Sequence, residues 1–98
     1  MYGTIARMRL KPGMEERIQQ FNRDFESVHV PGWIAEYAYR MDTDSNEYYL
    51  AVVFESKETY IANATAPEQH VRYQQLLELL EGEPEWHDGE IVYAYPAR

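Results

Sequence analysis

Seven consecutive residues, from Tyr48 to Phe54, form an uninterrupted apolar run that reads YYLAVVF. A strand that is apolar at every position must be covered on both faces of its sheet. The whole sequence predicts four strands but only two helices, and two helices can cover only one face of a four-stranded sheet. A second copy of the same sheet is the simplest cover for the other face. The sequence therefore predicts a homodimer formed through sheet faces.

The charge and the cysteine count exclude several classes of partner. The formal net charge of -8 argues against nucleic acid and against anionic membranes, because both attract basic surfaces. No apolar stretch approaches the roughly 18 residues that a membrane helix requires. The absence of Cys excludes disulfides and thiolate chemistry, and it fits a reducing compartment. We therefore expect a cytoplasmic protein without a membrane or nucleic-acid partner.

Length and aromatic content point to one domain that binds a small molecule. The 98 residues predict a single domain over 1–98, near the lower size limit for one hydrophobic core. Nine Tyr accompany three Phe and two Trp, and tyrosine combines an apolar ring with a polar tip. This composition favours a small neutral or aromatic ligand.

Apolar spacing divides the chain into strands and helices. Alternation predicts strands at 2–10, 33–40, 47–55 and 86–95. Spacings of three and four predict a helix of about fourteen residues after Gly13. A second helical region begins after the N-cap candidate Ser56, is interrupted at Pro67 and continues to Glu81. The order β-α-β-β-α-β predicts an α+β fold, a ferredoxin-like subunit with a four-stranded antiparallel sheet.

The two middle strands are expected to form a hairpin across the polar segment 41–46. If Tyr39 faces Tyr48, one face carries the bulky side chains of Trp33, Ala35, Tyr37, Tyr39, Tyr48, Leu50, Val52 and Phe54. The sheet-to-sheet face then carries charged residues, namely Arg7, Arg9, Glu36, Arg40 and Glu55. A shift by one residue would exchange the faces of one strand relative to the other, and the loop length permits it.

Three segments resemble the antibiotic biosynthesis monooxygenase-like family of dimeric α+β barrels. They are IARMRLKPG at 5–13, VFESKE at 53–58 and PEWHDGEI at 84–91. The resemblance implies two sheets packed face to face in a dimer, with a pocket between each subunit's own helices and sheet. The family includes cofactor-independent quinone-forming monooxygenases, haem-degrading enzymes and an autoinducer-processing branch.

The resemblance implies that the haem-degrading branch uses an Asn on the first strand, a Trp at the end of the third and a His on the second helix, and this chain keeps a candidate only for the His. This chain has no Asn in its first strand and carries Phe54 where the Trp is expected, so we do not expect haem degradation.

The second helical region carries the candidate catalytic residues. Helical spacing places six residues on or near one face: Tyr60, Asn63, His70, Tyr73, Leu77 and Leu80. In the functional interpretation, His70 removes a phenolic or enolic proton or donates a hydrogen bond, while Asn63 and Tyr73 hold the oxygen substituents. In the structural interpretation, His70 is a core histidine bonded to a backbone carbonyl, and Tyr73 reaches solvent.

An aromatic wall is the candidate substrate-binding surface. Its expected members are Trp33, Tyr37, Tyr39, Tyr48, Phe54 and Tyr60. Half-buried strands are also rich in Tyr without any functional reason. The neighbouring pair His87 and Asp88 is a weak catalytic candidate, because adjacent strand residues point to opposite faces.

The pattern contains no metal constellation, phosphate-binding glycine loop or dinucleotide fingerprint, so we expect no cofactor. The first functional hypothesis is a cofactor-independent monooxygenase acting on a small aromatic or polyketide-like phenol. The alternative is a non-catalytic small-molecule-binding or stress-related dimer, and an autoinducer-like isomerase is a third possibility.

Overall fold

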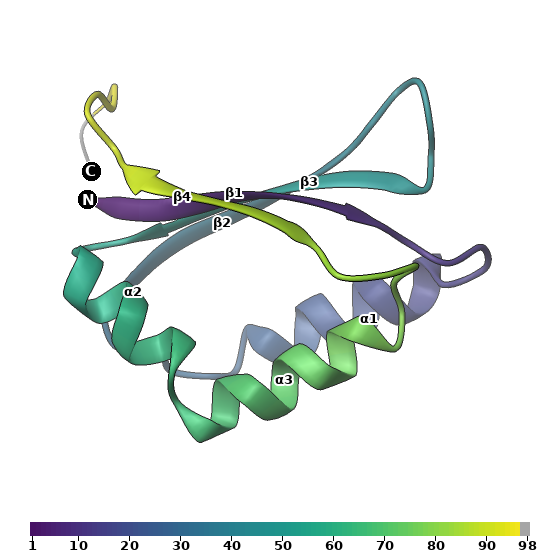
Figure 1. Cartoon of the computed structure of the whole chain (residues 1–98), viewed down its shortest axis with the longest axis horizontal. Helices are drawn as coiled ribbons and strands as arrows, with labels where there is room; N and C mark the ends of the chain where they lie inside the picture. The colour runs from purple at the N-terminus through teal and green to yellow at the C-terminus, as the bar shows by residue number, and fades with distance from the viewer. Residues whose placement is uncertain (97–98) are drawn as a thin grey trace.

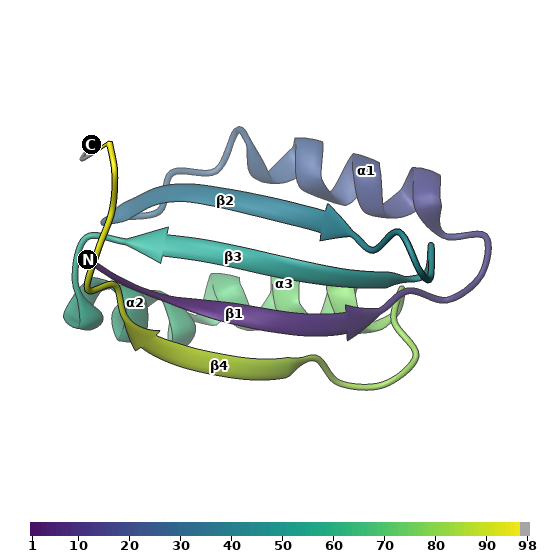
Figure 2. The same cartoon turned by 90° about the horizontal axis from the view of Figure 1, so that it is seen from above.

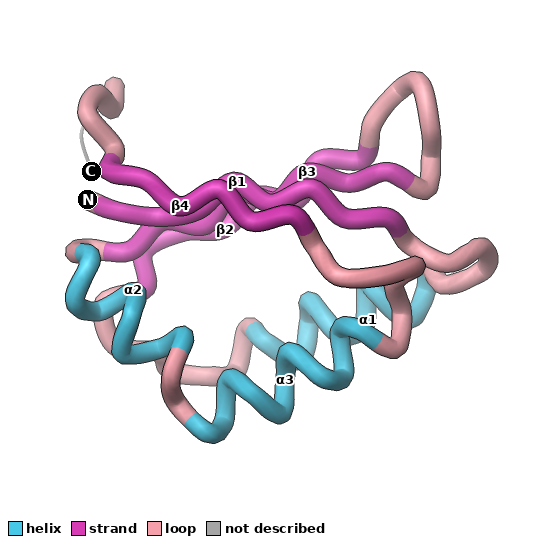
Figure 3. Tube along the Cα trace, viewed as in Figure 1, coloured by secondary structure: helices cyan, strands magenta, loops and turns pink. Residues whose placement is uncertain are grey.

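The computed structural model describes residues 1–96 as two layers, a sheet with helices on one of its faces (Figures 1 and 3). In chain order the elements are β1 (Tyr2–Arg9), α1 (Glu15–Phe25), β2 (Trp33–Arg40), β3 (Glu47–Phe54), α2 (Lys57–Ala64), α3 (Pro67–Leu77) and β4 (Glu85–Glu90). The strands pair antiparallel in the order β2-β3-β1-β4 (Figure 2). This confirms the ferredoxin-like α+β fold and the interruption of the second helical region at Pro67.

The sheet has one face covered by helices, here called the helix face, and an uncovered open face (Figure 1). Side chains of β1 alternate between them as the sequence predicts. Buried side chains point to the helix face from Thr4, Ala6 and Met8, whereas Ile5, Arg7 and Arg9 are exposed on the open face. The central strand therefore supplies both the floor beneath the helices and part of the open surface.

The hydrophobic core fills only one end of the space between the layers. Its buried members are Ala6, Met8, Leu10, Ile18, Leu76, Leu79 and Leu80. The rest of the interlayer space, toward α2 and the start of β1, is hollow and forms the cavity described below. No helix within residues 1–96 is long and apolar enough to cross a membrane.

The start of α2 is fixed by its N-cap. The Thr59 backbone N–H donates to Ser56 Oγ at 3.1 Å, and the Ser56 backbone N–H donates to Thr59 Oγ1 at 3.3 Å. This reciprocal capping box confirms Ser56 as the N-cap. It turns the chain directly from β3 into α2, so that α2 covers one end of the sheet.

Three predicted elements extend beyond the ends that the structure shows. Helix α1 stops at Phe25, where the Ser27 hydroxyl donates to a carbonyl of the last turn. Helix α3 stops at Leu77 rather than Glu81, because the next residues turn back to pair with the end of β1, with a bridge between Leu10 and Leu80. Strand β4 ends at Glu90 rather than Tyr95, because its partner strand β1 begins at Tyr2, which pairs with Glu90.

The expected hairpin register was wrong. Tyr39 pairs with Tyr49 rather than Tyr48, and a bulge between Trp33 and Ala35 leaves one extra residue, Ile34, in β2. A bulge reverses the alternation of every later residue in its strand. Tyr37 and Tyr39 therefore lie on the open face, whereas Glu36 and Arg40, expected on that face, lie on the helix face.

Candidate active site

A cavity of about 460 Å³ lies between the helices and the sheet. Every strand and every helix contributes to its wall, and the rings that line it belong to Phe21, Phe25, Trp33, Phe54, Tyr60, Tyr73 and Trp86. The volume falls within the range of pockets that bind small organic ligands, and an apolar wall with a few polar groups is typical of such pockets. The geometry therefore favours a flat, mostly apolar ligand.

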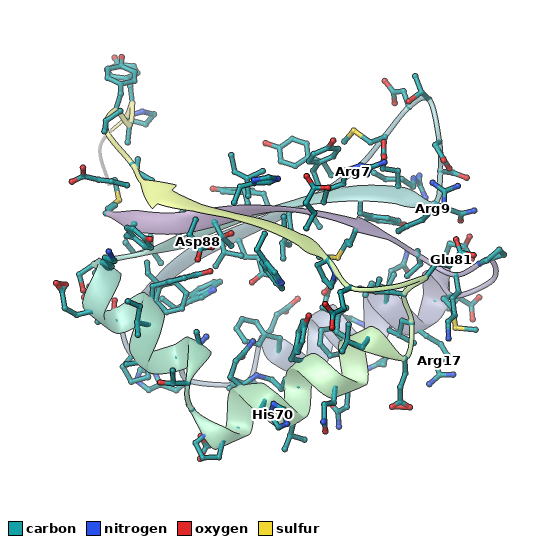
Figure 4. All side chains as sticks on the ribbon, viewed as in Figure 1. Arg7, Arg9, Arg17, His70, Glu81 and Asp88 are labelled. Atoms are coloured by element: carbon teal, nitrogen blue, oxygen red, sulfur yellow. The ribbon has the colours of Figure 1, made fainter. Side chains whose placement is uncertain are left out.

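The three candidate catalytic residues come together at this cavity. Asn63 on α2 and His70 and Tyr73 on α3 all line it, although Pro67 separates the two helices. His70 is exposed, so we place it at the mouth of the cavity on the helix layer (Figure 4). Its ring forms no hydrogen bond with any other residue in 1–96, so it is not the carbonyl-bonded core histidine of the structural interpretation.

The aromatic wall is only partly the one that the sequence predicts. Trp33, Phe54 and Tyr60 line the cavity, with the rings of Phe54 and Tyr60 centred 5.5 Å apart. Tyr37 and Tyr39 were assigned wrongly, since both lie on the open face and are more than half exposed. Tyr48 is on the helix face, but it lines a separate hollow of about 50 Å³.

The bulge explains which of these assignments failed. Trp33 precedes the extra residue and keeps its expected face, whereas every later residue of β2 is reversed. Phe25 and Phe21 of α1 complete the wall opposite the sheet, and the ring of Phe25 is centred 5.9 Å from that of Trp33.

A hydroxyl pair and a carboxylate meet at the α2 end of the cavity. The Tyr60 hydroxyl donates a hydrogen bond of 2.8 Å to Asp88 Oδ1. Burial, reinforced by this carboxylate, raises the pKa of Tyr60 to about 12, so the phenol stays protonated and remains a donor to Asp88 at neutral pH. The nearby Thr4 hydroxyl opposes the rise slightly, but it lies outside hydrogen-bonding geometry.

Thr4 is itself unusual. Its side chain is 5% exposed, and Thr4 Oγ1 has no hydrogen-bond partner within residues 1–96. Buried hydroxyls are normally satisfied by protein, water or ligand, because an unmade hydrogen bond is costly. Alternation predicts that Thr4 faces inward, but only the fold shows that a cavity lies above it.

Glu36 is the second polar residue that the sequence did not reveal as part of the site. Its side chain lines both the main cavity and the smaller hollow, and it forms no ion pair within residues 1–96. Burial raises the pKa of Glu36, and the Trp33 indole N–H, which favours the charged form, partly opposes that rise. A partly buried carboxylate with a raised pKa and no cation partner is a typical candidate for a functional group.

Several charged residues of the sheet form ion pairs on its open face. Arg7 Nε donates to Glu47 Oε2 at 2.7 Å, and Arg9 Nη1 lies 2.6 Å from Asp44 Oδ2. Figure 4 shows Arg9 and Glu81 together at one end of the sheet, and they form an ion pair at 3.2 Å. These residues make surface ion pairs and take no part in the cavity.

The His87 and Asp88 pair separates as expected. His87 lies on the open face, where its Nε2 is 2.9 Å from Glu85 Oε1, whereas Asp88 points to the cavity and Tyr60. Within residues 1–96, no three His, Asp or Glu side chains come together in a way that could hold a metal ion.

Comparison by sequence finds no protein family and no curated protein that matches this chain. Comparison by structure finds SnoaB, a cofactor-independent oxygenase from Streptomyces nogalater, with a TM-score of 0.77 at 14% identity, covering 98% of this chain and 97% of SnoaB. A Chloroflexus aurantiacus protein, named provisionally as an antibiotic biosynthesis monooxygenase, has a TM-score of 0.77 at 21% identity, covering 96% of this chain and 95% of that protein. At such identities the likeness establishes the fold alone. The chain therefore has the fold of the antibiotic biosynthesis monooxygenases.

Proposed function

We propose that this protein is a cofactor-independent oxygenase that acts on a small aromatic or polyketide-like phenol bound in the helix–sheet cavity. The observation that carries this proposal is the cavity itself, about 460 Å³ in volume, lined by several aromatic rings and other apolar side chains and reached by the polar side chains of His70, Asn63 and Tyr73. The fold shared with SnoaB, which is named as a cofactor-independent oxygenase, adds support.

The proposed reaction needs only the substrate and dioxygen. His70 takes the phenolic proton, and the resulting anion is electron-rich enough to react with dioxygen. One oxygen atom replaces a ring hydrogen and becomes a carbonyl, the other leaves as water with that hydrogen and the phenolic proton, and the substrate supplies all four electrons. Asn63 and Tyr73 bind the oxygen substituents, and the surrounding rings hold the substrate flat and limit access of water.

Oxygen consumption and product formation test this function. A panel of naphthols and anthrones is assayed with and without air, with product identified by mass. We expect turnover only in air, and His70→Ala should lower kcat about a hundredfold, the typical contribution of a general base. Gln74→Ala, an exposed change on the same helix, is the matched control and should leave kcat unchanged.

Two results would argue against the oxygenase. Turnover at the same rate without oxygen would indicate an isomerase or a related enzyme. Binding without any product, unaffected by His70→Ala, would identify the protein as a non-catalytic binding module.

We also propose that the active form is a homodimer joined through the open faces of two sheets. On this face Ile5, Tyr37 and Tyr39 are 57%, 60% and 56% exposed. A group of large apolar side chains exposed together on one face is typical of an interaction surface. The 41–46 loop and the segment after β4 both project from the same side of the sheet, away from the helices (Figure 1).

The oligomeric state is measured by sedimentation at micromolar concentration. We expect a dimer for the wild-type chain and a shift toward monomer for Tyr37→Lys, which would bury a charge in the interface. A stably folded wild-type monomer would contradict this proposal.

A further inference from the structure

One row of side chains crosses the floor of the cavity, perpendicular to the strands. Register pairs Glu36 with Val52, Val52 with Thr4, and Thr4 with Asp88. Paired residues in an antiparallel sheet project from the same face, and all four line the cavity. Because neighbouring strands lie about 4.8 Å apart, the backbones of Glu36 and Thr4 are separated by about 10 Å, with Val52 between them.

Thr4, which lies beside Asp88 in the row, offers a buried hydroxyl to the cavity. Thr4 Oγ1 is buried and has no partner within residues 1–96. The neighbouring Tyr60 donates its only hydroxyl proton to Asp88, so Tyr60 has no proton left for Thr4 or for a ligand. A ligand oxygen near Thr4 would therefore be held by the Thr4 hydroxyl acting as donor.

The Glu36 end offers a carboxylate with no ion-pair partner. Its burial raises the pKa, and its neighbour Trp33 contributes an indole N–H but no positive charge. An ionised carboxylate can only accept hydrogen bonds, so it selects a ligand group that donates one. Arg72 also lines the cavity, but its guanidinium donates to Gln69 Oε1 at 2.9 Å and 3.2 Å and lies over the Phe25 ring.

We propose that Glu36 and Thr4 form a two-point binding site for a neutral aromatic molecule. The ligand carries a hydroxyl donor on the edge that faces Glu36 and an oxygen acceptor on the opposite edge, which faces Thr4. Val52 supports the ring between them. The backbone separation of about 10 Å is of the same order as the span of one ring that carries an oxygen on each edge and forms a hydrogen bond of about 2.8 Å at each end. The ligand is neutral because the row already carries the carboxylates of Glu36 and Asp88.

This site rests on the proposed function for its ligand class and assigns which residues set the specificity. A site built to hydrogen-bond a polar group strongly rejects analogues that lack the group, because the buried partner is then left unpaired. Three redox-stable probes separate the two ends. They are 4-hydroxyacetophenone, with donor and acceptor; 4-methoxyacetophenone, without the donor; and 4-ethylphenol, without the acceptor.

Binding is measured by NMR titration and calorimetry on the full chain. We expect 4-hydroxyacetophenone to bind roughly tenfold more tightly than either analogue. In Thr4→Val, 4-hydroxyacetophenone should no longer bind more tightly than 4-ethylphenol, but it should still bind more tightly than 4-methoxyacetophenone. In Glu36→Gln, its affinity advantage over 4-methoxyacetophenone should shrink, and its advantage over 4-ethylphenol should stay unchanged.

Matched variants control for indirect effects. Thr4→Ser retains the hydroxyl and should preserve the wild-type ranking of the three probes. Thr43→Val and Glu16→Gln repeat the same chemical changes at exposed positions outside the cavity and should have no effect.

Equal affinities for the three probes in the wild-type protein would overturn the inference, as would a ranking that neither Thr4→Val nor Glu36→Gln alters. No binding of any probe would overturn it too. The probes bind without consuming oxygen, so the two proposals fail separately. If the probes show the expected ranking of affinities but no oxygenase turnover is found, the binding site is retained and the oxygenase is rejected. If turnover is found without that ranking, the oxygenase is retained and the binding site is rejected.

Discussion

Tyr60 should keep its proton at a pH at which an ordinary tyrosine has lost it. Burial, and secondarily the hydrogen bond of 2.8 Å to Asp88, raises the pKa of Tyr60 from 10.0 to about 12. At pH 11 about 10% of Tyr60 would therefore be ionised, against about 90% of a tyrosine with the ordinary value. Because the folded pKa lies above the unfolded one, the stabilisation is complete below about pH 10 and is lost as the pH rises toward 12.

The assay is an NMR titration of ring-labelled tyrosine, with circular dichroism to confirm that the chain stays folded. Tyr60→Phe assigns the signal. Asp88→Asn should lower the midpoint while leaving it above the ordinary value, because burial is the larger cause. Tyr93→Phe, an exposed change beyond β4, should leave the Tyr60 titration unaltered. A Tyr60 midpoint near 10 in the folded wild-type protein would refute the assigned environment.

Three further changes test the fold by thermal and denaturant unfolding. Gly3→Ala should cost about 2 kcal/mol or more, because its Cβ would collide with the Val52 carbonyl oxygen, whereas Gly89→Ala meets open space and should be tolerated. Ser56→Ala should cost about 1 kcal/mol through loss of the N-cap, and an unchanged midpoint would contradict the capping role. Glu36→Gln should raise stability at neutral pH, since burial raises the pKa of Glu36 above 4.5, and the gain should vanish below that value.

The sequence predicted the elements well because their local signals agree with the fold. Alternation defined β1, the Ser56 cap marked the start of α2, and Pro67 marked the break before α3. The ends were less predictable, because β4 and α3 stop where their partners stop. A period in the sequence does not reveal how far a neighbouring strand reaches.

The candidate site was predictable on the helices and much less so on the sheet. His70 and Tyr73 share a cavity because helical spacing places them on one face of α3, and Asn63 reaches the same cavity from α2. Glu36 and Thr4 were missed for different reasons. The bulge moved Glu36 to the cavity, and no local pattern marks a bulge without Gly. Thr4 looks like any inward residue of a central strand until its neighbours are known.

The extra residue in β2 makes the chemistry of the cavity depend on the register of an edge strand. Because β2 is an edge strand, it pairs on one side only, and the insertion at Ile34 disturbs a single ladder. Taking Ile34 into the regular ladder would shift every later pair of β2 by one residue, which would return Tyr37 and Tyr39 to the helix face and turn Glu36 outward. A one-residue slip of this register would thus exchange an acidic pocket for a phenolic one. An edge strand of this kind offers relatives of this fold a short evolutionary route between ligand classes.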